Sequence, residues 1–147
     1  MTSPELENLV GLGQLKREPC TPRDFDSLVK SGAARLADAT NPAVSVDGRF
    51  DLAYNAAHAL ALAALRHHGY RSENRYVVFQ ALAHTLHVAP ETWRVLAKAH
   101  ERRNMAEYEG VLDMDERLLK DVIAAAQVVL KGVKGLTSLE VPKQRPR

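Results

Sequence analysis

The sequence lacks the features that identify several large classes of protein. Its only cysteine is Cys20, so it has no disulfide framework, and a reduced, cytoplasmic setting is the default. The first twenty residues contain no basic region followed by an apolar run, which argues against a signal peptide. The most apolar run, DLAYNAAHALALAAL, is too short and too rich in alanine to span a bilayer. We therefore expect a soluble, cytoplasmic protein that binds no membrane.

The motifs of common enzymes and metal sites are also missing. There is no Walker phosphate loop, no GxSxG motif and no Cys/His spacing of a zinc site, so we expect no cofactor and no metal. The HTLH segment (84–87) has no carboxylate or cysteine beside it, which favours packing or surface histidines. The net charge is only +2, and residues 136–147 supply all of it, with three basic residues against one acidic. Any contact with nucleic acid must therefore be local.

What the sequence does contain is a series of helical patterns. Thr21 followed by Pro22 and Asp24 predicts the start of one helix, and Gly69 predicts the end of another. The second pattern is apolar around most of its circumference, which is typical of a central helix. The helices are expected at about 21–39, 49–68, 72–86 (capped by Ser72), 90–108 and 116–133 (capped by Asp113 with Glu116).

These patterns predict an all-α protein with no strand. Short loops between the helices favour a four- to five-helix antiparallel up-and-down bundle over residues 21–135. Residues 1–20 form an N-terminal extension in which a short helix would begin at Pro4. Residues 136–147 form a basic tail that we expect to be disordered.

The fourth helical pattern changes character along one face. At 100° per residue that face is apolar for two turns and then polar; it carries Trp93, Leu96, Ala97, His100, Arg103, Asn104 and Glu107. A partly buried guanidinium needs an acceptor, because an unpaired buried charge is costly. Glu107 could pair with Arg103 and close the end of the bundle. Alternatively, the polar residues form a binding site.

Three segments together resemble the HEPN superfamily of small prokaryotic helical bundles. They are GRFDLAYNAAHALALAALRHHGY, then RRNMAEYEG, then the amphipathic closing helix, and the resemblance as a whole covers roughly residues 22–133. The family pattern AYxAAxxA…LL…G is matched by Ala53, Tyr54, Ala56, Ala57 and Gly69. The resemblance implies a homodimer acting in a toxin–antitoxin or phage-defence type system. Several such proteins are metal-independent ribonucleases, and many are toxins paired with a nucleotidyltransferase antitoxin.

The resemblance also assigns roles to single residues. Arg103 matches the family arginine and Asn104 its polar follower, whereas Tyr108 stands where a histidine is usual. Metal-free cleavage of RNA needs an acid and a base with pKa values near the working pH, and a tyrosine pKa of ~10 does not fit. Catalysis by Arg103 and Tyr108 as a metal-independent endoribonuclease therefore stays open. Binding of RNA or a nucleotide is the firmer expectation, through Arg102, Asn104, Glu107, His100 and His58.

Two other interpretations remain open at this point. The same residues could be structural, in a non-catalytic homodimeric interaction module. A helical enzyme of another kind would be favoured if His58, His100 and Glu107 converged in one pocket.

Overall fold

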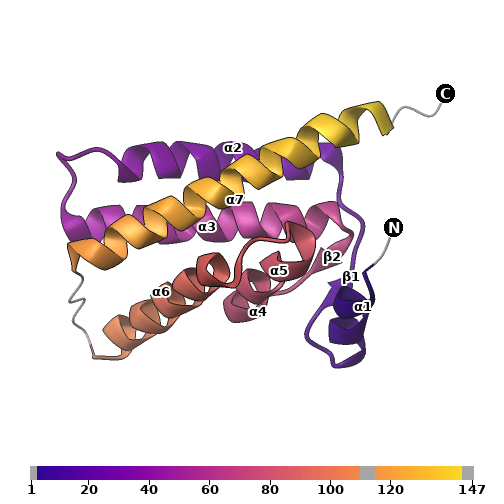
Figure 1. Cartoon of the computed structure of the whole chain (residues 1–147), viewed down its shortest axis with the longest axis horizontal. Coiled ribbons are helices and arrows are strands. Elements are labelled where there is room, and N and C mark those ends of the chain that lie inside the picture. The colour runs from indigo at the N-terminus through magenta and orange to yellow at the C-terminus, as the bar shows by residue number, and fades with distance from the viewer. Residues whose placement is uncertain (1–2, 110–114, 144–147) are drawn as a thin grey trace.

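Helices make up most of the chain in the computed structural model, which describes residues 3–109 and 115–143 and, of their side chains, residues 3–105 and 115–136 (Figure 1). This confirms the all-α class. The elements are α1 (Pro4–Gly11), β1 (Lys16–Arg17), α2 (Pro22–Ala39), α3 (Val46–His67), β2 (Tyr70–Arg71), α4 (Arg75–Gln80), α5 (Leu82–Thr85), α6 (Pro90–Glu109) and α7 (Glu116–Lys143). None of the described helices is both long and apolar enough to cross a bilayer.

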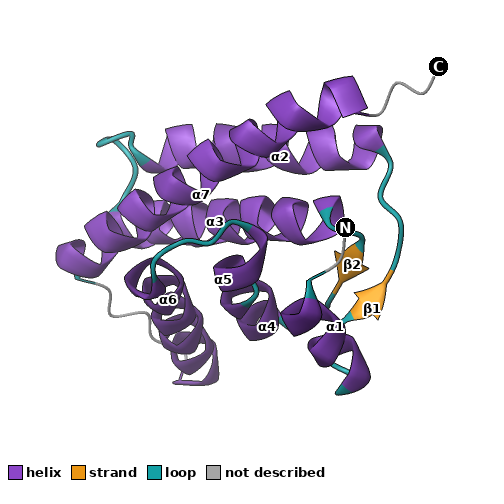
Figure 2. Cartoon of the chain, turned by 45° about the vertical axis from the view of Figure 1, so that its right-hand side comes forward, coloured by secondary structure: helices purple, strands orange, loops and turns teal. Residues whose placement is uncertain are grey.

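The core is built around α3. This helix lies beside α2 and α7 on one side and contacts α4, α5 and α6 on the other (Figures 1 and 2). Its small side chains let the neighbouring helices approach closely; the fully or almost fully buried alanines are Ala53, Ala56, Ala57, Ala59, Ala61, Ala63 and Ala64. The prediction of a central helix is confirmed.

Side-chain caps determine where the helices begin. Thr21 Oγ1 accepts a hydrogen bond from the Asp24 backbone N–H at 3.1 Å, as the sequence predicts. The expected start of α3 near residue 49 is wrong, because Ser45 Oγ accepts from the Gly48 N–H at 3.0 Å and adds a polar first turn. That turn has no apolar residue pattern to reveal it.

Two other predicted caps are displaced by two residues. Ser72 Oγ accepts from the N–H of Asn74 within the preceding turn, so it is Asn74 that caps α4. Asp115 caps α7 by accepting from the Leu118 N–H at 2.7 Å, while Asp113 lies outside the described residues. In both cases a polar residue nearer the helix competes for the same orphan N–H groups.

The predicted single helix over 72–86 is divided into α4 and α5. The backbone tightens at Ala81, whose carbonyl accepts from the N–H of His84 at 2.8 Å as well as from that of Thr85 at 2.9 Å. An i→i+3 bond of this kind narrows the helix locally. The apolar spacing still buries Val78 and Leu82, which explains why the pattern suggested one continuous helix.

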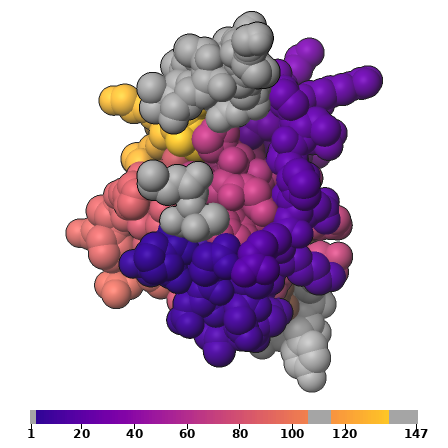
Figure 3. Space-filling model, turned by 90° about the vertical axis from the view of Figure 1, so that its right-hand side faces the viewer, coloured from indigo at the N-terminus to yellow at the C-terminus, as the bar shows by residue number. Residues whose placement is uncertain are grey.

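The N-terminal extension is part of the core. A short helix does begin at Pro4, and Leu6 and Leu15 are buried. The expectation of no strand is wrong, since β1 pairs antiparallel with β2, with Lys16 opposite Arg71. Strands of two residues are too short to show a periodic pattern. Figure 3 shows the N-terminal segment lying across one face of the molecule.

The last helix continues to Lys143, although the sequence predicts its end near residue 133 and a disordered tail from residue 136. Gly132 explains part of the difference. A Cβ at this position would lie 3.1 Å from Leu86 Cδ1, so the glycine serves a close approach rather than a helix end. The side chains from residue 137 onward lie outside the described residues.

Gly32 marks the tightest contact between α2 and α3, and it yields a stability prediction. A Cβ there would lie 2.6 Å from Leu60 Cγ and 3.2 Å from the Ala56 carbonyl oxygen. Gly32→Ala should therefore lower the free energy of unfolding by about 1–3 kcal/mol in a denaturant titration. Gly135→Ala is the control: no atom of the described residues outside its own helix backbone lies within 4 Å of the added methyl, and it should stabilise by up to ~1 kcal/mol. Equal stability of both variants would contradict close packing at Gly32.

Candidate functional site

Three helices bring a group of polar side chains together, which we call the polar cluster. One face of α3 contributes residues at i, i+3/i+4 and i+7, a spacing that aligns side chains along a helix. Residues from α4 and α6 complete the group. The polar cluster consists of Asp51, Tyr54, Asn55, His58, Arg75, His100, Arg103 and Asn104.

Arg103 forms an ion pair across to α3. Its Nη2 lies 3.1 Å from Oδ1 of Asp51, and the two side chains are 31 % and 43 % exposed. The sequence suggested Glu107 as the partner, but the Glu107 side chain lies outside the described residues. Arg103 is therefore partly buried, as the helix pattern suggested, and an ion pair this accessible to water contributes at most about 1 kcal/mol.

His100 is held by contacts at both ring nitrogens. Nδ1 lies 2.8 Å from the hydroxyl of the buried Tyr54, and Nε2 lies 3.2 Å from Nδ2 of Asn104. Since the Asn104 amide nitrogen donates, Nε2 accepts and Nδ1 carries the proton of the neutral ring. Burial, and then the charge of Arg75, lower the pKa of His100. His100 is thus neutral near pH 7 and fixed in position.

Arg75 contacts an aromatic ring and a neutral amide in the polar cluster, and it forms no ion pair with a described carboxylate. Its guanidinium lies 5.3 Å from the centre of the Tyr54 ring, and Nη1 donates to Asn55 Oδ1 at 3.1 Å. The Asn55 amide in turn donates to the Asp51 carbonyl at 2.9 Å. Among the side chains that the structure describes, no carboxylate forms an ion pair with Arg75, although it is half-buried. A half-buried charge without a counter-ion favours an anionic ligand.

His58 lies beside Arg75 and is neutral. Its ring packs edge-on against Phe79, with the ring centres 6.0 Å apart. Burial lowers the pKa of His58 to about 4, with smaller contributions from Arg75 and His100. Neither ring nitrogen has a hydrogen-bond partner within the described part of the chain, and the side chain lines a groove. The ring nitrogens are therefore available to a ligand.

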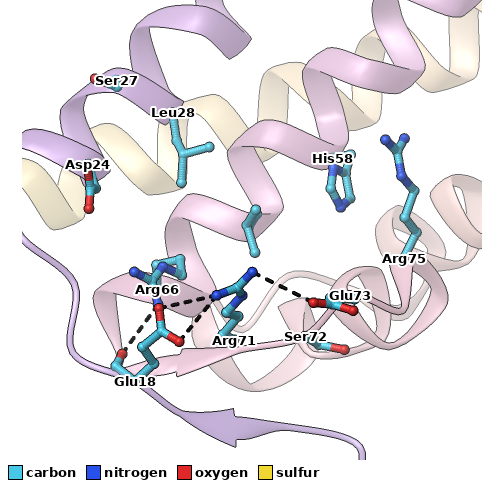
Figure 4. A pocket seen from close by; sticks show the side chains of 11 residues that line it. Glu18, Asp24, Ser27, Leu28, His58, Arg66, Arg71, Ser72, Glu73 and Arg75 are labelled. Atoms are coloured by element: carbon cyan, nitrogen blue, oxygen red, sulfur yellow. Dashed lines mark hydrogen bonds and ion pairs between the residues drawn. The ribbon is translucent and has the colours of Figure 1, made fainter.

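The groove has a volume of about 590 Å³ and lies between α2, α3 and the β2–α4 connection (Figure 4). Arg75 and His58 form one end of it. Arg66 and Arg71 line another part, where both contact Glu18, at 3.2 Å and 3.3 Å. Arg71 also lies 3.7 Å from Glu73. The charges on this wall are matched within the protein.

The structure joins some of the predicted site residues and leaves others undescribed. His58, His100, Arg103 and Asn104 all belong to the polar cluster. Arg102 is half-buried on α6, and its role in binding stays a prediction. Tyr108, like Glu107, lies in α6 with its side chain outside the described residues, so neither the catalytic role of Tyr108 nor a pocket combining Glu107 with the two histidines is tested.

Sequence reasoning missed Asp51, Asn55 and Arg75 as site residues, and it identified Tyr54 only as a match to the family pattern. The spacing of Asp51, Asn55 and His58 on one helix was a signal that could have identified a polar stripe. Arg75 gave no such signal, because it begins a short helix with no polar face.

Cys20 is half-buried and burial raises the pKa of its thiol, which agrees with an unreactive side chain.

The bond between Tyr54 and His100 gives a second stability prediction. Tyr54→Phe removes the hydroxyl and leaves Nδ1 of His100 without that partner. The free energy of unfolding at pH 7 should fall by about 1–3 kcal/mol, measured by denaturant titration. Tyr76→Phe is the control, since Tyr76 on α4 is 43 % exposed and its change should stay within about 0.5 kcal/mol. Equal effects of the two variants would show that this bond does not stabilise the fold.

Comparison with known proteins returns no relative. No family model matches the chain, and neither a curated protein nor a solved structure matches it. Within the described residues, no group of three or more histidine, cysteine or carboxylate side chains is placed to hold a metal ion.

Proposed function

We propose that this chain is a HEPN-like helical protein of a toxin–antitoxin or phage-defence type system, which binds RNA or a nucleotide at the polar cluster. The first two of the three segments that resemble HEPN proteins lie on contacting helices, α3 and α6. Tyr54 from the first contacts His100 from the second, and Asp51 contacts Arg103. This pairing of the two segments supports the proposal.

The observation that carries the proposed ligand chemistry is the charge of Arg75, which forms no ion pair with any carboxylate that the structure describes. Arg75 and Arg103 supply two positive charges against the single carboxylate of Asp51, and His58 and His100 are neutral near pH 7. The polar cluster therefore has a net charge of +1. Guanidinium groups bind phosphate oxygens through two parallel N–H donors, so a phosphate of RNA or of a nucleotide is the matching ligand.

Cleavage is less well supported than binding. Metal-independent cleavage needs a base for the 2′-hydroxyl and an acid for the leaving oxygen. Neutral His58 can accept a proton, but the lowered pKa values of His58 and His100 leave no protonated imidazole near pH 7. Both nitrogens of His100 are also engaged. The proposal is therefore for a binding protein, with ribonuclease activity as a separate question.

A pair of variants that each remove one charge tests this function. Labelled single-stranded RNA would be titrated against wild type, Arg103→Gln and Asp51→Asn. Arg103→Gln should weaken binding about tenfold because it removes a phosphate contact. Asp51→Asn should strengthen binding, because the carboxylate no longer competes with phosphate for Arg103. RNA affinity unchanged in both variants would refute the proposal. Incubation of wild type with RNA and a metal chelator would show whether cleavage accompanies binding.

A second candidate is a non-catalytic homodimeric interaction module. The observation that favours it is that His100 and Arg103 already have partners inside the protein. In that case Arg103→Gln and Asp51→Asn should lower the free energy of unfolding to a similar extent, with no RNA bound by wild type. Sedimentation of the wild type would test the homodimer, and co-purification with a nucleotidyltransferase would test the proposed antitoxin partner.

A further inference from the structure

The groove beside the polar cluster has charges of opposite sign at its two ends, and neither forms an ion pair with a described side chain. At one end is the half-buried guanidinium of Arg75, next to the neutral ring of His58. At the other is Asp24, an exposed residue in the first turn of α2, whose carboxylate forms no ion pair or hydrogen bond with any described side chain (Figure 4). A ligand that fits both ends has an anionic group at one extremity and N–H donors at the other.

The middle of the groove is apolar or internally neutralised. Leu28 from α2 and Leu62 from α3 line it with apolar surface. The neighbouring arginines are already paired with Glu18 and Glu73. The body of the ligand should therefore be uncharged and offer a flat or apolar surface to the leucines, while its anionic group and its N–H donors lie at the two ends.

The length of the groove limits the size of the ligand. His58, Leu62 and Arg66 line it from successive turns of α3. The eight residues from His58 to Arg66 correspond to about 12 Å along the helix axis at 1.5 Å per residue. This is too long for a free amino acid and suits a mononucleotide. The volume of about 590 Å³ also falls in the range of small-molecule sites.

We propose that the groove binds a guanine nucleotide, an inference that rests on the proposed nucleotide-binding function and deepens it. The phosphate would lie at Arg75 and His58, and the base would lie against Leu28 and Leu62. Guanine carries two adjacent donors, N1–H and the N2 amino group, which a carboxylate accepts as a parallel pair. Adenine has an acceptor at N1 that would face the Asp24 carboxylate unfavourably. Asp24 thus determines base preference, and Arg75 determines affinity for phosphate.

Calorimetric titration of the whole chain with GMP, AMP and inorganic phosphate tests this inference. Wild type should bind GMP about tenfold more tightly than AMP, as expected for one bidentate base contact. Asp24→Asn should abolish that preference and leave the affinity for inorganic phosphate unchanged. Arg75→Gln should weaken binding of all three. Asp38→Asn is the matched control, because Asp38 is exposed near the far end of α2 and does not line the groove.

The outcomes separate this inference from the proposed function. Equal affinity of wild type for GMP and AMP, or a preference that survives Asp24→Asn, would overturn the guanine site. If RNA binding still depended on Arg103, the proposed function would stand without it. Conversely, a GMP preference that depends on Asp24, with no RNA bound through Arg103, would support the groove and refute RNA binding at the polar cluster.

Discussion

Arg75→Gln is expected to lower the affinity for single-stranded RNA at least tenfold and to leave the free energy of unfolding within about 1 kcal/mol of wild type. The loss of affinity follows because a guanidinium binds phosphate through charge-assisted hydrogen bonds that glutamine cannot replace. Stability changes little because the described residues provide no carboxylate that would be left alone. The substitution removes one hydrogen bond to Asn55 and the contact with the Tyr54 ring, and it also removes an uncompensated charge.

Arg94→Gln is the matched control for this experiment. Arg94 is exposed on α6, nine residues before Arg103, which places it on the opposite side of the helix at 100° per residue. Arg94→Gln lowers the net charge of the protein by one, as Arg75→Gln does. It therefore measures how much RNA affinity is lost through the general electrostatic attraction alone. The slope of log affinity against log salt concentration should become shallower by about one unit for Arg75→Gln, because one phosphate contact is lost. An equal loss of RNA affinity in both variants would contradict a specific contact at Arg75. It would show that RNA binding depends only on the net charge of the protein.

Lowering the pH from 6.5 to 4 should reduce the free energy of unfolding by roughly 3 kcal/mol through His58 alone. Burial, then Arg75 and His100, hold the pKa of His58 at about 4 in the folded protein, against 6.5 for the free side chain. Between these values the unfolded chain binds a proton that the folded chain does not bind, so protonation favours unfolding. The stabilisation is complete above pH 6.5 and is lost progressively as the pH falls to 4. The figure follows from the shift at about 1.36 kcal/mol per pKa unit.

Denaturant titrations over this pH range, in wild type and His58→Gln, check the prediction. The variant has no group to titrate at this position, so its stability should fall by roughly 3 kcal/mol less than that of wild type. Arg75→Gln should give an intermediate result, because the positive charge of Arg75 contributes to the low pKa of His58. Parallel pH profiles for wild type and His58→Gln would contradict the prediction, because they would show that His58 has the same pKa in the folded and unfolded states.

The helices themselves were largely predictable, because their signals are local. Thr21 caps α2 as expected, Pro90 begins α6, and Gly69 follows α3 with a φ of 89° that suits glycine. The errors arose where two polar residues compete for one helix end, as Ser72 and Asn74 do, or where a polar first turn precedes the apolar pattern, as at Ser45. The β1–β2 pairing joins segments more than fifty residues apart, and neither contains a pattern of its own.

The sequence by itself determined the all-α class, the central position of α3 and the presence of His100, Arg103 and Asn104 on one face of α6. Periodicity shows which residues share a face of one helix, but it does not show which helix lies opposite. Only the tertiary structure decided that Arg103 pairs with Asp51, that His100 contacts Tyr54, and that Arg75 lies beside His58 without a counter-ion among the described residues. These contacts depend on how α3, α4 and α6 pack, which is set by complementary surfaces distributed over the whole chain.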